Sequence, residues 1–462
     1  MNDLVIRNGI LVTSEMTQKA DIAVNKGKIV KLGLLGNADQ GKREIDAKGK
    51  LVIPGLIDPH IHIAHPFRED ISKDDFYTAT KAAVFGGNTS IIDFAIQWDK
   101  SMSLDQCIQK RKTEAEGNAV IDYSFHACPT KSNEETIQEV SNVYKHGITS
   151  FKAYMIYRKQ GRMVDDAILF GLLQKNLEFG GILGVHAENA AIAEYNETSY
   201  TKRGLESAKY FPEIKPNIVE AEGINRAVFL NKWLESRLYI FHLSTQEGLK
   251  IIRNAQREGN HVICETCTHY LTLNKDVYSR KDGYNYICSP PLRSQTDIDS
   301  LWAGIKDGTI SVVSTDHCGF GKKQKASGKG KFTDTPHGLP GIEVRLPLIY
   351  TEGVIKRGIS INKIVEVLST NPAKIFNMYP KKGSITIGSD ADLVIMDTNT
   401  EITLTNDKLH SPVDWTPYEG MKLSGFAYAT ILRGEILMQN GEFYGKKGYG
   451  QFISRITDKV QN

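Results

Sequence analysis

Eight short apolar runs separated by amphipathic stretches are the feature that most limits which fold this chain can adopt. Each run predicts a β-strand, and the runs are residues 56–62, 89–95, 120–127, 148–155, 181–186, 238–243, 261–265 and 310–316. The stretches between them have helical periodicity, for example residues 74–85, 167–179, 220–235 and 246–258, and several end in glycine, as helix C-termini favour. Eight such strand–helix units predict an α/β fold, a (β/α)8 barrel of the TIM type.

The two ends of the chain are patterned differently from its middle. Residues 4–12 and 21–32 alternate apolar and polar side chains, and residues 392–396, 401–405 and 427–437 repeat this pattern. Because neither end forms a stable sheet alone, we expect one small β-sandwich built from both termini. The predicted domains are residues 1–54 (the first part of the β-sandwich), 55–379 (the barrel) and 380–462 (the rest of the sandwich and a tail).

Composition excludes several classes of partner. The 57 Lys and Arg residues nearly balance the 54 Asp and Glu residues, so nothing indicates binding to nucleic acid or to an acidic membrane surface. Met1-Asn2-Asp3 leads into a short strand-like run, and no run is long enough to span a membrane, so neither a signal peptide nor a membrane anchor is expected. The six cysteines are scattered and do not form a disulfide framework, which favours the cytoplasm.

Two local patterns have a structural interpretation. Cys264-Glu265-Thr266-Cys267 is a single CxxC motif, and without a second pair it is more typical of small side chains at a strand end than of a zinc ribbon. Residues 322–331 are rich in Lys and Gly and follow the eighth predicted strand, so we expect a loop there.

Residues able to bind a metal lie where the apolar runs end. In a parallel barrel the C-terminal ends of all strands meet at one face, so we expect these side chains to converge. His60 and His62 are two residues apart, so on a strand they point to the same side and reach one divalent ion. Taken alone, this pair is equally typical of a polar strand face. The six residues, from the first, fourth, fifth, sixth and eighth runs, are His60, His62, Lys152, His186, His242 and Asp316.

Lys152 is the unusual member of this set, because a charged amine repels a metal ion. In a buried site beside metals the charged form is disfavoured, and the neutral amine can react with CO2. The resulting carbamate is a carboxylate that can bridge two metals. A Lys152 paired with a carboxylate is the alternative interpretation.

Over nearly its whole length the chain resembles the cyclic amidohydrolases, namely dihydropyrimidinase, hydantoinase and allantoinase. Besides the six residues above, the motifs that carry the resemblance are Ser150-Phe151-Lys152, His186-Ala187-Glu188-Asn189, His242-Leu243-Ser244, Ser289-Pro290-Pro291-Leu292-Arg293, Thr315-Asp316-His317, the stretch 388–394 and Glu419-Gly420-Met421.

The resemblance implies a centre of two divalent metal ions, expected to be Zn²⁺, with CO2-derived carboxylation of Lys152. One ion takes His60, His62, Lys152 and Asp316, and the other takes Lys152, His186 and His242. A hydroxide shared by the two ions attacks the ring carbonyl. Asp316 takes the hydroxide proton and passes it to the leaving ring nitrogen, while Tyr157 helps to hold the oxyanion.

The resemblance also implies the residues that contact substrate. Tyr157 stands where hydantoinases and dihydropyrimidinases carry a substrate-binding Tyr, and Ser289 offers backbone contacts to the ring. Phe67, Ile96 and Trp98 follow the first two predicted strands and are expected to line the substituent pocket. One departure from the family pattern is His337, which stands where hydantoinases usually have an Asn with a backbone contact to the ring.

The expected activity is ring opening of a hydantoin or dihydropyrimidine, and the expected partner is a small cyclic ureide or imide. Tyr157 favours this activity over that of an allantoinase, and an allantoinase or cyclic imidase on the same scaffold is the alternative. Scaffold proteins related to dihydropyrimidinase lack the metal ligands, so the presence of all six argues against a non-enzymatic role. The family suggests a homotetramer, in which the tail 445–462 packs on a neighbour.

Overall fold

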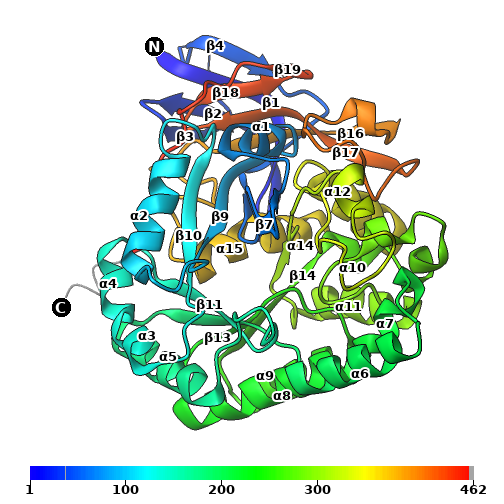
Figure 1. Ribbon diagram of the computed structural model, residues 1–462. Helices are drawn as coiled ribbons and strands as arrows, with labels where there is room; N and C mark the ends of the chain where they lie inside the picture. Colours follow the sequence, from blue (N-terminus) through cyan, green and yellow to red (C-terminus); the bar gives the residue numbers. More distant parts are fainter. Residues whose placement is uncertain (37, 457–462) are drawn as a thin grey trace.

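The computed structural model describes residues 1–36 and 38–456. An eight-stranded sheet forms the centre of the molecule, and its strands follow one another in chain order (Figure 1). Each pair of neighbours is parallel. The strands are β6 (Leu56–Asp58), β9 (Asn88–Ile96), β10 (Asp122–Cys128), β11 (Ser150–Tyr154), β12 (Ile182–His186), β13 (Leu238–Ile240), β14 (Val262–Cys267) and β15 (Val312–Ser314). Each of the eight predicted runs contains or overlaps one strand, which confirms the predicted barrel.

The barrel is nearly closed, and a buried arginine links its first and last strands. The guanidinium of Arg345 donates hydrogen bonds to the backbone oxygens of Ile57 in β6 and Val313 in β15, both at 2.9 Å. Beyond the strand ends, Ile61 pairs with His317 as an isolated parallel bridge. Arg345 is fully buried, and these bonds give its guanidinium acceptors in place of water.

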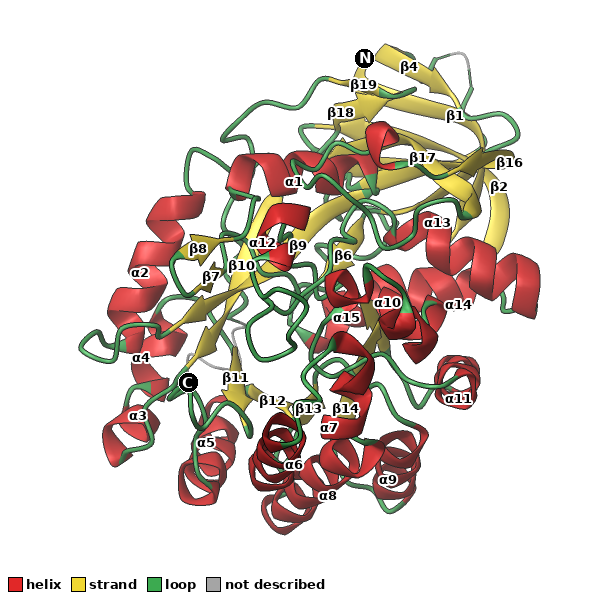
Figure 2. Ribbon diagram, turned by 45° about the vertical axis from the view of Figure 1, so that its right-hand side comes forward, coloured by secondary structure: helices red, strands yellow, loops and turns green. Residues whose placement is uncertain are grey.

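The helices cover the outside of the barrel (Figures 1 and 2). They are α1 (Phe76–Phe85), α2 (Leu104–Ala115), α3 (Glu134–Gln138), α4 (Val140–Lys145), α5 (Asp166–Phe179), α6 (Ala190–Lys202), α7 (Phe211–Ile214), α8 (Asn217–Leu234), α9 (Gln246–Arg257), α10 (Thr268–Thr272), α11 (Gln295–Asp307), α12 (Lys322–Ala326), α13 (Arg345–Ile349), α14 (Ile361–Val365) and α15 (Asn371–Ile375). Among the described residues no helix is both long and apolar enough to cross a membrane.

Local sequence signals explain where these helices begin and end. Helix α5 begins after Asp165, whose carboxylate accepts a hydrogen bond from the backbone N–H of Ile168 at 3.0 Å. It ends before Gly180, which has a left-handed φ of 64° that glycine adopts without strain. Such caps fix the point at which the chain turns back toward the barrel.

Strands from both termini pair in one nine-stranded, mostly antiparallel sheet beside the barrel (Figure 1). Strand β5 (Leu51–Pro54) joins the two ends by pairing with β1 (Asn2–Val12) and β16 (Leu393–Thr403). The others are β2 (Thr17–Asn25), β3 (Lys28–Gly33), β4 (Gly41–Asp46), β17 (Lys422–Leu432), β18 (Glu435–Gln439) and β19 (Glu442–Phe443). The sheet has its own hydrophobic core, which includes Ile6, Ile22 and Leu393. This sheet confirms the prediction that both termini build one small β structure beside the barrel.

Two segments make contacts within the chain that the sequence did not predict. Residues 322–331, predicted as a loop, contain helix α12, and the buried Nζ of Lys325 donates to the backbone oxygens of Ile287 at 2.8 Å and Pro336 at 2.7 Å. The described part of the tail packs on the barrel of the same chain, where the buried Arg455 donates to Ser150 Oγ at 2.8 Å. The rest of the predicted tail, residues 457–462, lies outside the described residues.

Candidate active site

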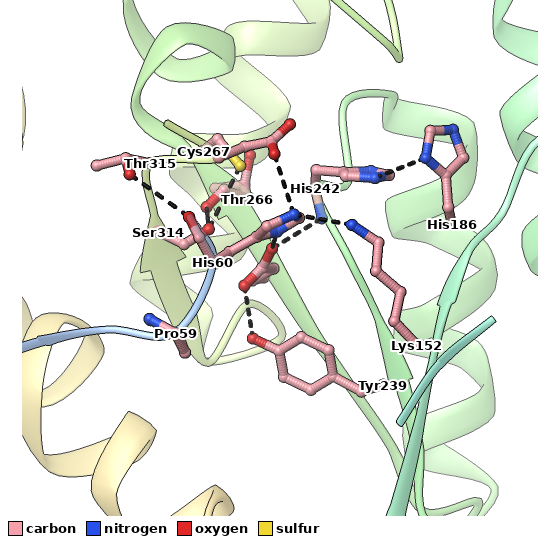
Figure 3. Close-up of polar contacts among 12 residues, drawn as sticks. Pro59, His60, Lys152, His186, Tyr239, His242, Thr266, Cys267, Ser314 and Thr315 are labelled. Atoms are coloured by element: carbon pink, nitrogen blue, oxygen red, sulfur yellow. Dashed lines mark hydrogen bonds and ion pairs between the residues drawn. The ribbon is translucent and has the colours of Figure 1, made fainter. Parts of the chain in front are cut away.

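The six predicted metal-binding residues lie together at the C-terminal end of the barrel strands. Lys152 lies within β11 and His186 is the last residue of β12, whereas the others follow their strands by two to four residues. Figure 3 shows the side chains of His60, Lys152, His186 and His242 directed toward one another. The remaining two members of the set are His62 and Asp316, which lie close to His60.

Two close groups of polar atoms form this site. In the first, Asp316 Oδ1 lies 3.0 Å from His60 Nε2 and 3.2 Å from His62 Nε2. In the second, His242 Nε2 lies 3.0 Å from His186 Nδ1. Lys152 lies between them, with its Nζ 2.9 Å from His60 Nε2. The arrangement therefore matches two metal positions that share a lysine.

The backbone at this site departs from the strand geometry that the sequence predicted. Strand β6 ends at Asp58, so His60 and His62 converge from a short extended segment held by a hydrogen bond from His62 N to His317 O at 2.7 Å. His242 and Asp316 have left-handed φ values of 42° and 47°. Such a conformation costs a non-glycine residue roughly 1–2 kcal/mol, and it is typical of functional sites.

Burial keeps the imidazoles of His62, His186 and His242 uncharged. At His60 burial acts in the same direction, but the carboxylates of Asp316 and Glu265 outweigh it and raise the pKa. Loss of solvation lowers the pKa of His62 to about 3 and that of His186 to about 4, although hydrogen bonds to carboxylates act in the opposite direction. Burial also lowers the pKa of the Lys152 amine. Neutral imidazole is the form that binds a metal, and a neutral amine is the form that reacts with CO2.

The residues present fit a metal centre. Atoms of His60, His62 and Asp316 all lie within 4.8 Å of one another, as the ligands of one ion do. The buried Nδ1 atoms of His62 and His242 have no hydrogen-bond partner among the described residues. Lys152 Nζ faces an imidazole nitrogen, and within the described ranges no carboxylate forms an ion pair with it. Crowded nitrogen atoms of this kind are stable when a cation lies between them.

Two buried glutamates support the ligands, and sequence reasoning gave neither a role. Glu265 in β14 contacts His60 Nδ1, accepts from the hydroxyl of Tyr239 at 2.8 Å and accepts from the backbone N–H of His242 at 3.2 Å. Glu188 lies 2.7 Å from His186 Nε2. Carboxylates that bind the far nitrogen of a ligand His fix its ring orientation and tautomer. An acidic residue at the end of an apolar strand was the available signal for Glu265.

A cavity of about 180 Å³ opens onto the site. Five of the six metal-set residues line it, all but His60, together with four predicted substrate residues, which are Phe67, Tyr157, Ser289 and His337. Ile96 and Trp98 do not line the cavity. Ile96 is buried in a hydrophobic cluster with Phe94, and the ring of Trp98 lies 5.0 Å from that of His65, which does line the cavity. Their predicted contacts with the substituent stay a prediction.

Tyr157 and Ser289 present hydroxyl groups to this cavity. Tyr157 has a left-handed φ of 68°, and burial raises its pKa, so its phenol stays protonated and able to donate. Ser289 Oγ lies 2.8 Å from His337 Nδ1 and accepts a hydrogen bond from Lys215 Nζ at 3.0 Å. The same Lys215 Nζ donates to Glu188 at 2.8 Å, so a chain of polar contacts connects the ligand His186 to His337.

A barrel with ligand-type side chains at the C-terminal ends of its strands is an arrangement that can hold divalent metal ions for hydrolysis. The family model described as "Amidohydrolase family" matches residues 51–437, and the chain belongs to this family.

The relatives are similar to the chain over its full length. A D-hydantoinase of Ralstonia pickettii is 37% identical, with 98% of this chain and 99% of that protein covered. A D-hydantoinase of Geobacillus stearothermophilus is 38% identical over 98% of this chain and 96% of that protein. Among solved structures, a dihydropyrimidinase from Brevibacillus agri has a TM-score of 0.95 and 38% identity, covering 98% of both chains. The resemblance predicted from the motifs is therefore confirmed.

Proposed function

We propose that this protein hydrolyses the cyclic amide bond of a hydantoin- or dihydropyrimidine-type ring, at two zinc ions bridged by a carboxylated Lys152. The observation that carries the proposal is the convergence of three neutral imidazole groups, a buried lysine and Asp316 on one cavity. Full-length similarity to D-hydantoinases and a dihydropyrimidinase supports the choice of ring.

The ligand residues divide into two sets according to their contacts. His60, His62 and Asp316 would hold one ion, and His186 and His242 the other, with Lys152 between them. When bound, the two ions supply activation of water and polarisation of the carbonyl group. Burial of Lys152 favours its neutral amine, which supports the proposed carboxylation.

Asp316 is the proposed proton carrier. Its carboxylate lies at the cavity wall beside both imidazoles of the first set, where it can accept a proton from the attacking water. It then passes this proton to the ring nitrogen that leaves. A protonated Tyr157 is the proposed donor to the oxygen that becomes negatively charged.

The invariant part of the substrate is proposed to bind beside Ser289 and His337. Their side chains form a hydrogen bond with each other, which leaves their backbone groups free to contact the ring of the substrate. This arrangement explains how His337 can stand where a hydantoinase usually carries Asn: its imidazole holds Ser289, and burial lowers its pKa to about 3, so it is neutral. Phe67 lines the cavity and is the proposed contact for a substituent. Ile96 and Trp98 remain proposed contacts of larger substituents.

A homotetramer in the cytoplasm is part of the proposal. Helix α8 exposes Phe229 and Trp233, whose side chains are one helical turn apart and 73% and 84% accessible. Exposed apolar groups of this size are typical of subunit contacts. All six cysteines are unpaired, which fits a reducing compartment. Size-exclusion chromatography with light scattering tests the tetramer, and Trp233→Ser should weaken it.

A ring-opening panel tests the proposed reaction. The protein, supplied with Zn²⁺ and bicarbonate, is incubated with hydantoin, 5-substituted hydantoins, dihydrouracil, allantoin and succinimide. We expect hydantoins and dihydrouracil to open, with Asp316→Asn as the inactive control. Turnover of allantoin or succinimide alone would assign the alternative ring, and no turnover of any ring would contradict the proposed function.

A further inference from the structure

The loop that follows β11 forms one wall of the cavity. Residues 155–163 leave the barrel at Met155 and return beside the same strand, where Tyr154 pairs with Met163 as an isolated bridge. The backbone N–H of Arg162 donates to the oxygen of Tyr157 at 3.0 Å, which closes the loop on itself. Tyr157 and Arg162 are therefore neighbours on the same wall of the cavity.

Two aromatic rings hold the side chain of Arg162. Its guanidinium carbon lies 4.2 Å from the centroid of the Trp98 ring and 5.6 Å from that of Tyr157. The residue is half-buried. A guanidinium stacked on aromatic faces keeps its charge and its edge donors available, because the rings accept no hydrogen bonds in its plane. Arg162 is thus positioned before any ligand binds.

Outside the proposed metal set, the other two cationic side chains that line this cavity are paired with carboxylates of the protein. Lys159 Nζ lies 2.8 Å from Glu197, and Lys215 Nζ lies 2.8 Å from Glu188. Arg162 differs from them, since within residues 1–36 and 38–456 no carboxylate lies at ion-pair distance from its guanidinium and no acceptor takes a side-chain hydrogen bond from it. A fixed cation without a protein partner, at the wall of a substrate cavity, is a recognition element for an anion.

We infer that Arg162 recognises a carboxylate on the substituent of the ring, so that the preferred substrates are cyclic ureides or imides with an acidic side chain. The inference rests on the proposed function. A ring placed against Tyr157 lies next to Arg162, and a substituent of two or three carbons carries its carboxylate to the guanidinium. The planar guanidinium of Arg162 can donate two parallel hydrogen bonds to the two oxygens of a carboxylate, while the Trp98 ring beneath it holds it in position.

A matched pair of substrates tests this assignment. The carboxylate 5-(2-carboxyethyl)hydantoin and its amide, 5-(2-carbamoylethyl)hydantoin, have nearly the same shape but differ in charge, and unsubstituted hydantoin reports the ring reaction alone. We expect the wild-type protein to prefer the acid over the amide in kcat/KM by about tenfold or more, as a charged hydrogen bond allows. The preference should fall as KCl is raised, because salt screens the pair.

Variants of the loop separate recognition from packing. In Arg162→Gln the preference for the acid should disappear, while kcat/KM on hydantoin stays within about twofold of the wild-type value. Hydantoin has no carboxylate and so loses no contact when Arg162 is replaced. Arg162→Lys should retain part of the preference. The matched control is Arg158→Gln, because Arg158 lies on the same loop and is paired with Glu194 at 2.6 Å. This control should keep the wild-type preference.

The outcomes distinguish this inference from the function on which it rests. Equal kcat/KM for acid and amide in the wild type, or an equal loss on all three rings in Arg162→Gln, would overturn the role of Arg162 while ring opening stands. No opening of any ring by the wild-type protein would instead contradict the proposed function itself.

Discussion

The Nζ atom of Lys152 lies 2.9 Å from Nε2 of His60, in a fully buried position, and no carboxylate among the described residues forms an ion pair with it. A charged ammonium is disfavoured there, because it is desolvated and faces a nitrogen atom. The proposed carboxylation would remove the positive charge and would supply oxygen atoms able to bind metal. The contact between Lys152 and His60 therefore leads us to expect that replacement of either residue disturbs metal binding.

Replacement of Lys152 should remove both metal binding and activity. We expect Lys152→Ala to be inactive and metal-poor, and a short-chain carboxylic acid to restore some activity by standing in for the bridge. Reactivation of the metal-free wild type with Zn²⁺ should depend on bicarbonate. Metal content by mass spectrometry and kcat measure these effects, with Lys159→Ala as a control on the cavity rim. Full activity of Lys152→Ala would remove this residue from the site.

The purified protein should hold two divalent ions per chain. His60→Ala and His186→Ala remove one ligand from each metal position, so each variant should retain less than two ions and lose most of its kcat. His261→Ala is a suitable control, since this exposed residue directly precedes β14, at the opposite end of the strand from the ligand set. Active protein that contains no stoichiometric metal would show the binuclear interpretation to be wrong.

Asp316→Asn separates the ligand role of this residue from its role as proton carrier. Asparagine retains one oxygen for the metal but cannot accept the proton, so kcat should fall by at least about 10²–10⁴-fold, as for other general acid–base groups. Metal analysis of the same preparation must show two ions. Nearly normal kcat with both ions bound would assign the proton transfer to another group.

Tyr157 and Trp98 should affect different kinetic parameters. Tyr157→Phe removes the donor to the developing oxyanion and should lower kcat for every ring by roughly 10²–10³-fold. Trp98→Ala removes apolar support worth about 1–3 kcal/mol to substituted rings alone, so it should change the ratio of kcat/KM between substituted and unsubstituted hydantoins. Equal losses on all rings in Trp98→Ala would indicate a general loss of loop structure.

Lys325 should make stability depend on pH. Burial lowers its pKa to about 7 in the folded protein, against an ordinary value of 10.5. Between these values the unfolded chain binds a proton that the folded chain lacks, so this residue makes the free energy of unfolding rise with pH, by at most about 1.4 kcal/mol per pH unit.

Urea unfolding at pH 7.5, 8.5 and 9.5 measures this slope. It should be smaller in Lys325→Met than in the wild type, while the exposed Lys323→Met should leave it unchanged. An unaltered slope in Lys325→Met would show that Lys325 is charged in the folded protein.

Much of this protein follows from patterns that are local in the chain. Residues 56–62 and 181–186 alternate with amphipathic stretches, and the periodicity of side chains along one element requires no knowledge of its neighbours. The rule that parallel strands end at one face then places Lys152, His186 and the other ligands together. The sequence alone was therefore sufficient to predict the barrel and to bring the candidate metal ligands together at one end of it.

Other features depend on which elements become neighbours. Glu265 contacts His60 across 205 residues of chain, and Arg345 bridges β6 and β15 because the last strand comes back beside the first. The linear sequence likewise does not show whether a charged side chain such as Arg162 or Lys215 lies beside a carboxylate. These contacts are set by packing between segments that are distant in the sequence. Burial and charge pairing shift the pKa values and fix the orientations of the site residues, and both arise only when the chain has folded around the site.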